Sequence, residues 1–134
     1  MKRIISLTAL FSLAAVLFIG CSQVDNSLGK SMGRWEGFGV ESMTQSHEAG
    51  LDYIEVTMNT VIGKDTAGVR DRAALLKAQI DSAGLQIWSV HLPYSKKVDI
   101  SSIDSTRRVN AVNYVADMIR VAAVFNPKYL VLHP

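Results

Sequence analysis

The chain has 134 residues and a formal net charge of +2, because its 14 basic side chains almost balance its 12 acidic ones. If Lys2 and Arg3 leave with an N-terminal signal, 12 residues of each sign remain. A neutral domain lacks the positive surface that nucleic acids require, so we expect no nucleic-acid partner. The single cysteine, Cys21, excludes an internal disulfide, so the fold must be stabilised by core packing.

The N-terminus has the pattern of an export signal. Lys2 and Arg3 precede an apolar stretch over residues 4–19, which ends at Gly20 and Cys21. A plain signal peptide and an uncleaved anchor both fit this pattern. A membrane-spanning helix fits less well, because the stretch is shorter than the roughly 20 residues that cross a bilayer.

The end of this stretch is more specific. The segment Leu17-Phe18-Ile19-Gly20-Cys21 resembles the lipobox of bacterial lipoproteins, although Phe18 stands where leucine is usual. The resemblance implies a signal peptide over residues 1–20 and lipidation of Cys21. The protein would then be lipid-anchored in the bacterial cell envelope, facing the periplasm or attached to the outer membrane.

The chain after the cysteine is polar and contains glycine and serine. This composition is typical of a flexible linker. We therefore expect residues 21–36 to be a poorly ordered tether and residues 37–134 to be the folded domain.

Four short apolar runs in this domain are predicted to be β-strands. They are Gly37–Glu41, Leu51–Val56, Leu85–His91 and Lys128–His133. Each run carries a polar side chain at or near its end, and these side chains are Glu41, Glu55, His91 and His133. Parallel strands would place the four groups along one edge of a sheet.

The segments between the runs are predicted to be helices, because their apolar residues recur at spacings of three and four. The first connection, residues 42–50, is short and weakly patterned. The second has a stripe of Val69, Ala73, Leu76, Ile80 and Ala83, and Gly84 follows as a left-handed C-cap. The third has a stripe of Val109, Val112, Ala116, Ile119 and Ala123, with Ser105 or Thr106 as N-cap and Asn126-Pro127 as its end.

Strands that alternate with helices predict a parallel sheet, either open and doubly wound or closed into a barrel. No glycine-rich phosphate loop follows the first predicted strand, which weakens the nucleotide-binding alternative. In barrels the active site lies at the carboxyl ends of the strands, where the four polar groups fall. A complete barrel takes about 250 residues, so we expect the N-terminal half of a (β/α)8 barrel with about four strands.

Several residue patterns also resemble a known superfamily. The run Ala49-Gly50-Leu51-Asp52-Tyr53-Ile54-Glu55-Val56, the run Ser89-Val90-His91-Leu92-Pro93-Tyr94 and the closing Leu130-Val131-Leu132-His133-Pro134 resemble the xylose isomerase-like TIM barrels. That superfamily holds sugar phosphate isomerases and epimerases together with the endonuclease IV branch. The resemblance covers residues 37–134.

The resemblance implies a divalent metal, manganese, magnesium, zinc or cobalt, at the mouth of the barrel. In the isomerases and epimerases most metal ligands come from the second half of the barrel, which this chain lacks. In the endonuclease branch the histidines that end the third and fourth strands also bind metal, and they correspond to His91 and His133. The metal would polarise a sugar carbonyl or hydroxyl while a carboxylate moves a proton on the adjacent carbon.

On this basis His91 and His133 are the candidate metal ligands, Glu55 and His91 the candidate catalytic residues, and Glu41, His91 and His133 the candidate substrate contacts. Each has a structural alternative, as a satisfied core or capping histidine or as an ion-paired glutamate. Other polar or aromatic side chains are assigned structural roles: Trp88 and Tyr94 to the barrel wall, His47 to a solvated helix face, and Arg107 and Arg108 to a solvated helix start.

The expected function is therefore a metal-dependent sugar isomerase or epimerase, or a related lyase, anchored in the envelope and acting on a small sugar. A free sugar is favoured, because phosphorylated sugars are scarce outside the cytoplasm. The chain as given is expected to be inactive and to form homo-oligomers through its open sheet edge. The alternatives are a non-catalytic carbohydrate-binding lipoprotein and an endonuclease IV-like phosphoesterase.

Overall fold

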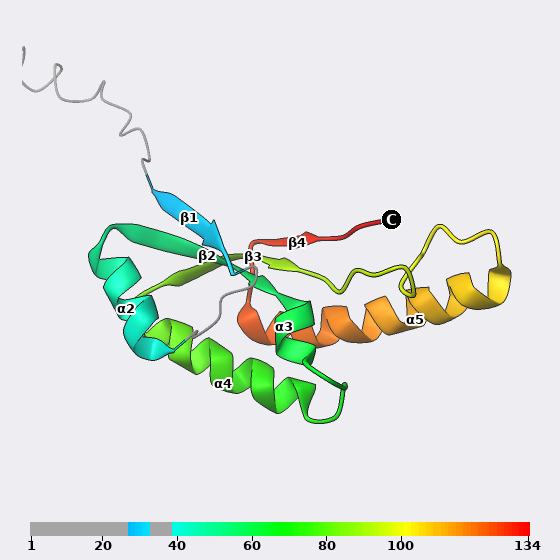
Figure 1. Cartoon of the computed structure of the whole chain (residues 1–134), viewed down its shortest axis with the longest axis horizontal. Helices are drawn as coiled ribbons and strands as arrows, with labels where there is room; N and C mark the ends of the chain where they lie inside the picture. The colour runs from blue at the N-terminus through cyan, green and yellow to red at the C-terminus, as the bar shows by residue number, and fades with distance from the viewer. Residues whose placement is uncertain (1–26, 33–38) are drawn as a thin grey trace, which may run out of the picture.

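The protein forms a four-stranded parallel β-sheet with helices packed on one of its faces, as Figure 1 shows. The computed structural model describes residues 27–32 and 39–134. The strands are β1 (Leu28–Ser31), β2 (Leu51–Thr57), β3 (Gln86–His91) and β4 (Tyr129–Val131), and they lie side by side in chain order. The predicted signal peptide and Cys21 fall outside the described residues.

The helices alternate with the strands, as predicted. They are α2 (Val40–Glu48), α3 (Met58–Ile62), α4 (Val69–Ser82) and α5 (Ser105–Ala122), and α5 continues into the 3₁₀ helix η1 (Ala123–Phe125). The described helices α2, α4 and α5 all cover the same face of the sheet (Figure 1). This one-sided cover belongs to a β/α barrel, since a doubly wound sheet carries helices on both faces.

The first strand differs from the prediction. β1 lies at Leu28–Ser31, within the segment expected to be a tether, whereas Glu41 lies in the first turn of α2 and not at a strand end. The sequence of β1 is polar and all four of its residues are exposed, so it has no apolar pattern. It is held at the sheet edge by backbone pairing with β2 and by a hydrogen bond from the Leu28 amide to the Asp52 carboxylate, at 3.1 Å.

Helix α4 follows the prediction closely. Val69, Ala73 and Ile80 are buried along one stripe, as their spacing predicts. Gly84 follows the helix with φ +82°, the left-handed conformation expected at this position. A side chain at Gly84 would meet the ring of His47, since an added Cβ would lie 2.7 Å from the ring. The glycine therefore allows α2 to approach the end of α4.

Helix α5 forms where predicted but buries a different face. Its N-cap is Asp104, whose carboxylate accepts a hydrogen bond from the Arg107 amide at 3.0 Å, so the predicted caps Ser105 and Thr106 are wrong. The residues that pack inward are Ala111, Val115, Met118, Val121 and Ala122. Of the predicted stripe, Val109, Val112, Ile119 and Ala123 are exposed. Two apolar stripes run along this helix, and contact with the sheet and α4 selects one of them.

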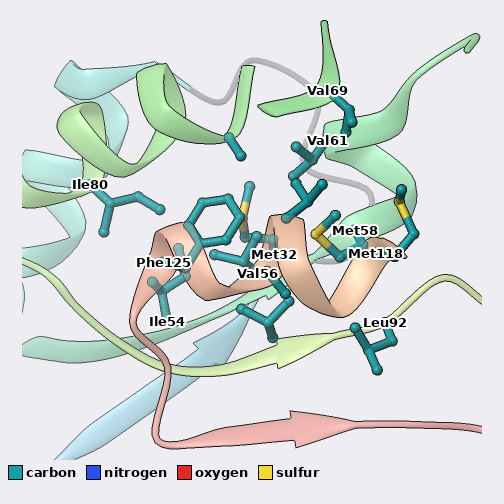
Figure 2. Packing of buried hydrophobic residues seen from close by; sticks show 14 of the residues in the cluster. Met32, Ile54, Val56, Met58, Val61, Val69, Ile80, Leu92, Met118 and Phe125 are labelled. Carbon is teal, nitrogen blue, oxygen red and sulfur yellow. The ribbon is translucent and has the colours of Figure 1, made fainter. Parts of the chain in front are cut away.

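One hydrophobic core fills the space between the sheet and the helices (Figure 2). Phe125 from η1, Ile54 and Val56 from β2, and Ile80 from α4 are almost completely buried there. The opposite face of the sheet, which would face the interior of a barrel, carries polar and aromatic side chains. None of the helices in the described part of the chain has the length and apolar character of a membrane span.

Candidate functional site

The ends of β2, β3 and β4 bring three of the predicted site residues together. His91 pairs with Thr57 on β2 and with Val131 on β4. His133 lies two residues beyond Val131, so alternation along the strand places it on the same face as His91. The hydrogen bond from the Leu92 amide to the Val131 carbonyl, at 2.9 Å, fixes this register one residue past the end of β3.

The two imidazoles meet edge to edge. The Nε2 atoms of His91 and His133 are 2.7 Å apart, although 42 residues separate them in the chain. The ring centroids are 4.8 Å apart and the ring planes differ by 23°. Because the nitrogens are much closer than the centroids and the rings are nearly parallel, each Nε2 points toward the other ring. Two lone pairs at this distance would repel, so one of the nitrogens carries a proton.

The position of Glu55 indicates which of the two Nε2 atoms carries the proton. Its Oε1 lies 3.4 Å from Nδ1 of His91, on the side of the ring away from His133. A carboxylate in this position favours a proton on Nδ1, which leaves a lone pair on Nε2 of neutral His91. With His91 neutral, His133 donates its Nε2–H to His91. The three side chains form a relay from Glu55 through His91 to His133.

The Glu55 carboxylate is itself held by two serines. Ser31 on β1 donates its hydroxyl to Oε1 at 3.0 Å, and Ser89 on β3 donates to Oε2 at 2.7 Å. Ser89 is buried, so the packing around it holds its hydroxyl in place. These contacts come from the strands on both sides of β2, which lock the glutamate in the middle of the sheet.

The same contacts keep Glu55 ionised. Partial burial of the carboxyl acts to raise its pKa, but the hydrogen bonds from Ser89 and Ser31 and the nearby His91 outweigh it and lower the pKa of Glu55 below its ordinary value of 4.5. An ionised carboxylate with both oxygens engaged is a poor proton acceptor for a substrate. It is well suited to orienting a histidine.

Tyr94 closes one side of the histidine pair. Its ring centroid lies 4.9 Å from that of His91 and 5.2 Å from that of His133. Asn59, just after β2, donates its side-chain amide to the Tyr94 carbonyl at 3.2 Å and so positions the loop after β3. Tyr94 was assigned to the barrel wall from the sequence. The structure instead places it against both imidazoles.

Other predicted residues lie away from this cluster. Glu41 is exposed on α2 and accepts a 3.5 Å hydrogen bond from Gln45 of the same helix, and it shares no ion pair with either histidine. His47 is exposed, as expected, but its Nδ1 also contacts the Leu51 carbonyl at 2.9 Å. Ser31, Ser89 and Tyr94 belong to the site and were missed. The only local signal for Ser89 was its position two residues before a strand-end histidine.

The open face of the sheet also carries an aromatic cluster. The ring of Trp88 lies 5.0 Å from that of Tyr53 and 5.5 Å from that of Tyr129, and the Lys128 ammonium lies 4.2 Å from the Trp88 ring centroid. A hollow of about 460 Å³ extends from Trp88 to Glu55 and Ser89 across β1, β2 and β3. Trp88 is 39% exposed, so its ring is accessible from this hollow.

The histidine pair has the donor chemistry of part of a metal site. Imidazole nitrogens are common ligands of divalent metals, and a carboxylate behind the ligating histidine is a frequent second partner in such sites. The Glu55–His91 arrangement fits this pattern. Within residues 27–32 and 39–134 there is no group of three or more histidine, cysteine, aspartate or glutamate side chains that would hold a metal alone. Further ligands or water would be needed to complete the coordination.

Comparison with known proteins agrees with the fold. No curated protein matches the chain. The family model described as xylose isomerase-like TIM barrel matches residues 43–134, which include β2, β3, β4 and every residue of the histidine relay. The four parallel strands and the helices on one face are the architecture of part of such a barrel. The chain belongs to the xylose isomerase-like TIM barrel family.

Proposed function

We propose that this chain is part of a metal-dependent sugar isomerase or epimerase whose metal is held in part by His91 and His133. The convergence of their Nε2 atoms at 2.7 Å is the observation that carries this proposal. To share a metal, the two nitrogens would move apart and the proton of His133 would shift from Nε2 to Nδ1, which leaves a lone pair on each Nε2. When bound, a divalent ion would polarise a carbonyl or hydroxyl of the sugar.

Glu55 is a positioning residue in this proposal. Its carboxylate favours the proton on Nδ1 of His91 and so leaves a lone pair on Nε2, while Ser31 and Ser89 hold the carboxylate in place. This role replaces the catalytic role expected from the sequence, because the lowered pKa of Glu55 makes it a weak base. The proton-moving carboxylate would come from elsewhere in a full barrel.

A free sugar suits the open face beside this relay. The hollow of about 460 Å³ combines the Trp88 ring with the hydroxyls of Ser31 and Ser89, and sugars present both apolar C–H faces and hydroxyl groups. We propose that the sugar spans this hollow with its reacting end near His91. The proposed lipid anchor at Cys21 would keep the protein in the cell envelope, where free sugars are the more available substrates.

The chain by itself is proposed to bind metal and sugar without turnover, since two histidines supply too few ligands for a hard metal site. The test uses the full chain in detergent with Mn²⁺, Mg²⁺, Zn²⁺ or Co²⁺ and a panel of free aldoses and ketoses. NMR should show sugar-induced shifts at Trp88 and His91 that depend on the metal, and no isomerised or epimerised product. Absence of sugar-induced shifts with every metal would contradict the sugar proposal, and turnover would contradict the proposed inactivity.

A non-catalytic carbohydrate-binding protein would respond differently to the same assay. Its sugar binding would persist without metal and would survive His91→Ala and His133→Ala. Loss of sugar binding in Trp88→Ala alone, with both histidine variants unaffected, would favour this alternative.

The histidine pair also favours a second candidate, an endonuclease IV-like phosphoesterase. Histidines that end the third and fourth strands are the positions at which the resemblance to that branch predicts metal ligands, and here they meet. The near-neutral charge of the chain speaks against a nucleic-acid substrate. Metal-dependent cleavage of DNA that contains an abasic site, abolished by His91→Ala, would establish this candidate and overturn the sugar assignment.

A further inference from the structure

The loop between β3 and α5 contains a second hollow, separate from the histidine relay. It has a volume of about 250 Å³, and its lining consists of Lys96, Lys97, Asp99, Ser102, Arg107 and Asn110. Three of these side chains are cations and one is a carboxylate. The hollow therefore combines a net positive lining with neutral hydrogen-bond donors.

None of the three cations forms an ion pair within the described part of the chain. Among the described residues, no carboxylate lies within ion-pair distance of Lys96, Lys97 or Arg107. The one carboxylate in the lining, Asp99, is occupied by its own loop, because its Oδ1 accepts from the Ser101 amide at 2.9 Å and from the Ser101 hydroxyl at 2.7 Å. Among the described residues the three cations therefore line the hollow without an ion pair, and Asp99 is the one carboxylate beside them.

The position of Arg107 is a second observation that favours an anion in this hollow. It lies in the first turn of α5, where a positive side chain opposes the helix dipole. The Arg107 amide is already used by the Asp104 cap, and its guanidinium makes no hydrogen bond within the described residues. An anion in the hollow would offset this unfavourable placement.

The loop that carries the cations is held in place before any ligand binds. Arg108 donates to the Ser102 carbonyl at 2.6 Å, which ties the loop to the helix. Ser95 and Val98 form an isolated bridge, and the Val98 side chain packs against the hydrophobic core. The backbone on which Lys96 and Lys97 sit is therefore held in place, and their exposed side chains line the hollow.

A more apolar hollow adjoins this charged hollow. Its lining shares Lys97 and Asn110 with the charged hollow and adds Val98, Ala111 and Tyr114. A charged pocket beside an apolar one fits a ligand with an anionic group and a carbon body. Because three cations with several N–H donors can surround a tetrahedral anion, phosphate is the group that this lining fits best.

We propose that the hollow formed by Lys96, Lys97 and Arg107 binds a phosphate group, carried by a small phosphorylated compound or by a lipid headgroup. This site is independent of the proposed sugar chemistry at His91 and His133, so either can fail without the other.

The test is titration of the full chain in detergent with inorganic phosphate and with glucose 6-phosphate, followed by amide NMR shifts of Lys96, Lys97 and Arg107. Glucose is the uncharged control ligand. Lys97→Gln/Arg107→Gln should weaken binding roughly tenfold or more, because each charge-assisted hydrogen bond contributes measurably. Lys64→Gln/Arg70→Gln removes the same charge from exposed positions on another part of the surface and should leave binding unchanged.

A separate arm distinguishes the two sources of phosphate. Vesicles of phosphatidylglycerol, compared with phosphatidylcholine, measure headgroup binding by co-sedimentation. Ile103 is 100% exposed at the edge of this loop, so Ile103→Ser should weaken vesicle binding and leave binding of glucose 6-phosphate intact if a lipid is the source. No saturable binding of inorganic phosphate, glucose 6-phosphate or phosphatidylglycerol, or equal losses in both double variants, would overturn the proposal.

Discussion

The Nε2 atoms of His91 and His133 lie 2.7 Å apart at the ends of neighbouring parallel strands. This distance arises because β3 and β4 pair in register, β3 ends on His91, and His133 lies two residues beyond the end of β4 on the same side of the sheet. Glu55, on the next strand, stands behind His91 and completes a three-residue relay. The relay is the part of the molecule that connects its fold to chemistry, and the first predictions concern it.

Metal binding should depend on both histidines. His91→Ala and His133→Ala should each weaken Co²⁺ or Zn²⁺ binding by at least about tenfold, and the double variant should lose little more, because the two act as one unit. Absorption of the bound Co²⁺ measures this. His47→Ala is the matched control, since His47 lies on α2 away from the relay, and it should bind metal normally. Equal losses of metal affinity in the His91, His133 and His47 variants would contradict the assignment of His91 and His133 as metal ligands.

Replacement of Glu55 should act through His91. Glu55→Gln removes the charge that holds the proton on Nδ1 of His91, so both tautomers of His91 should become populated and metal affinity should fall about 10–100-fold. The nitrogen chemical shifts of the His91 ring report the tautomer directly. If metal affinity fell with no change in those shifts, Glu55 would be a ligand and not a positioning residue.

Stability should decrease in acid through Glu55. Its pKa is lower in the folded protein than in the unfolded chain, so its ionised form stabilises the fold above about pH 4.5, and this contribution disappears as the pH falls through the folded pKa. Ser89→Ala removes one hydrogen bond to the carboxylate, should cost about 1–3 kcal/mol near neutral pH and should flatten this pH dependence. Ser82→Ala, at an exposed helix end, should change neither. Urea unfolding between pH 3 and 7 measures both variants.

The buried face of α5 can be tested with two valines of the same helix. Val115 is 5% exposed and Val112 is 48% exposed. Val115→Ala should therefore cost about 2 kcal/mol of unfolding free energy, whereas Val112→Ala should change it by less than about 0.5 kcal/mol. The reverse order in urea denaturation would mean that the stripe expected from the sequence is the one that packs.

Gly84 should be intolerant of a side chain for two reasons. Its positive φ costs an L-residue about 1–2 kcal/mol, and an added Cβ would lie 2.7 Å from the His47 ring, which the Leu51 carbonyl holds in place. Gly50 also has positive φ but has nothing within 4 Å, so Gly50→Ala shows strain alone. Gly84→Ala should be the more destabilising of the two, and His47→Ala should recover the difference. Equal thermal stabilities of the two glycine variants would contradict the contact.

Local patterns in the sequence were sufficient for much of the fold. The apolar runs at residues 51–56 and 85–91 became β2 and β3, and the stripe ending at Ala83 with Gly84 behind it became α4 and its cap. These features depend on spacing within a single element and on the conformation of one glycine. They can therefore be recognised without knowing what the element packs against.

Long-range contacts decided the rest. β1 is too polar to be recognised and exists because β2 offers it a paired edge, and α5 has two apolar stripes between which only packing can choose. The sequence placed His91 and His133 at strand ends, but their distance follows from the register of β3 and β4. That register brings the two histidines together, and the serines on either side of Glu55 hold its carboxylate beside His91. These residues are far apart in the chain, so they meet only after the sheet has formed.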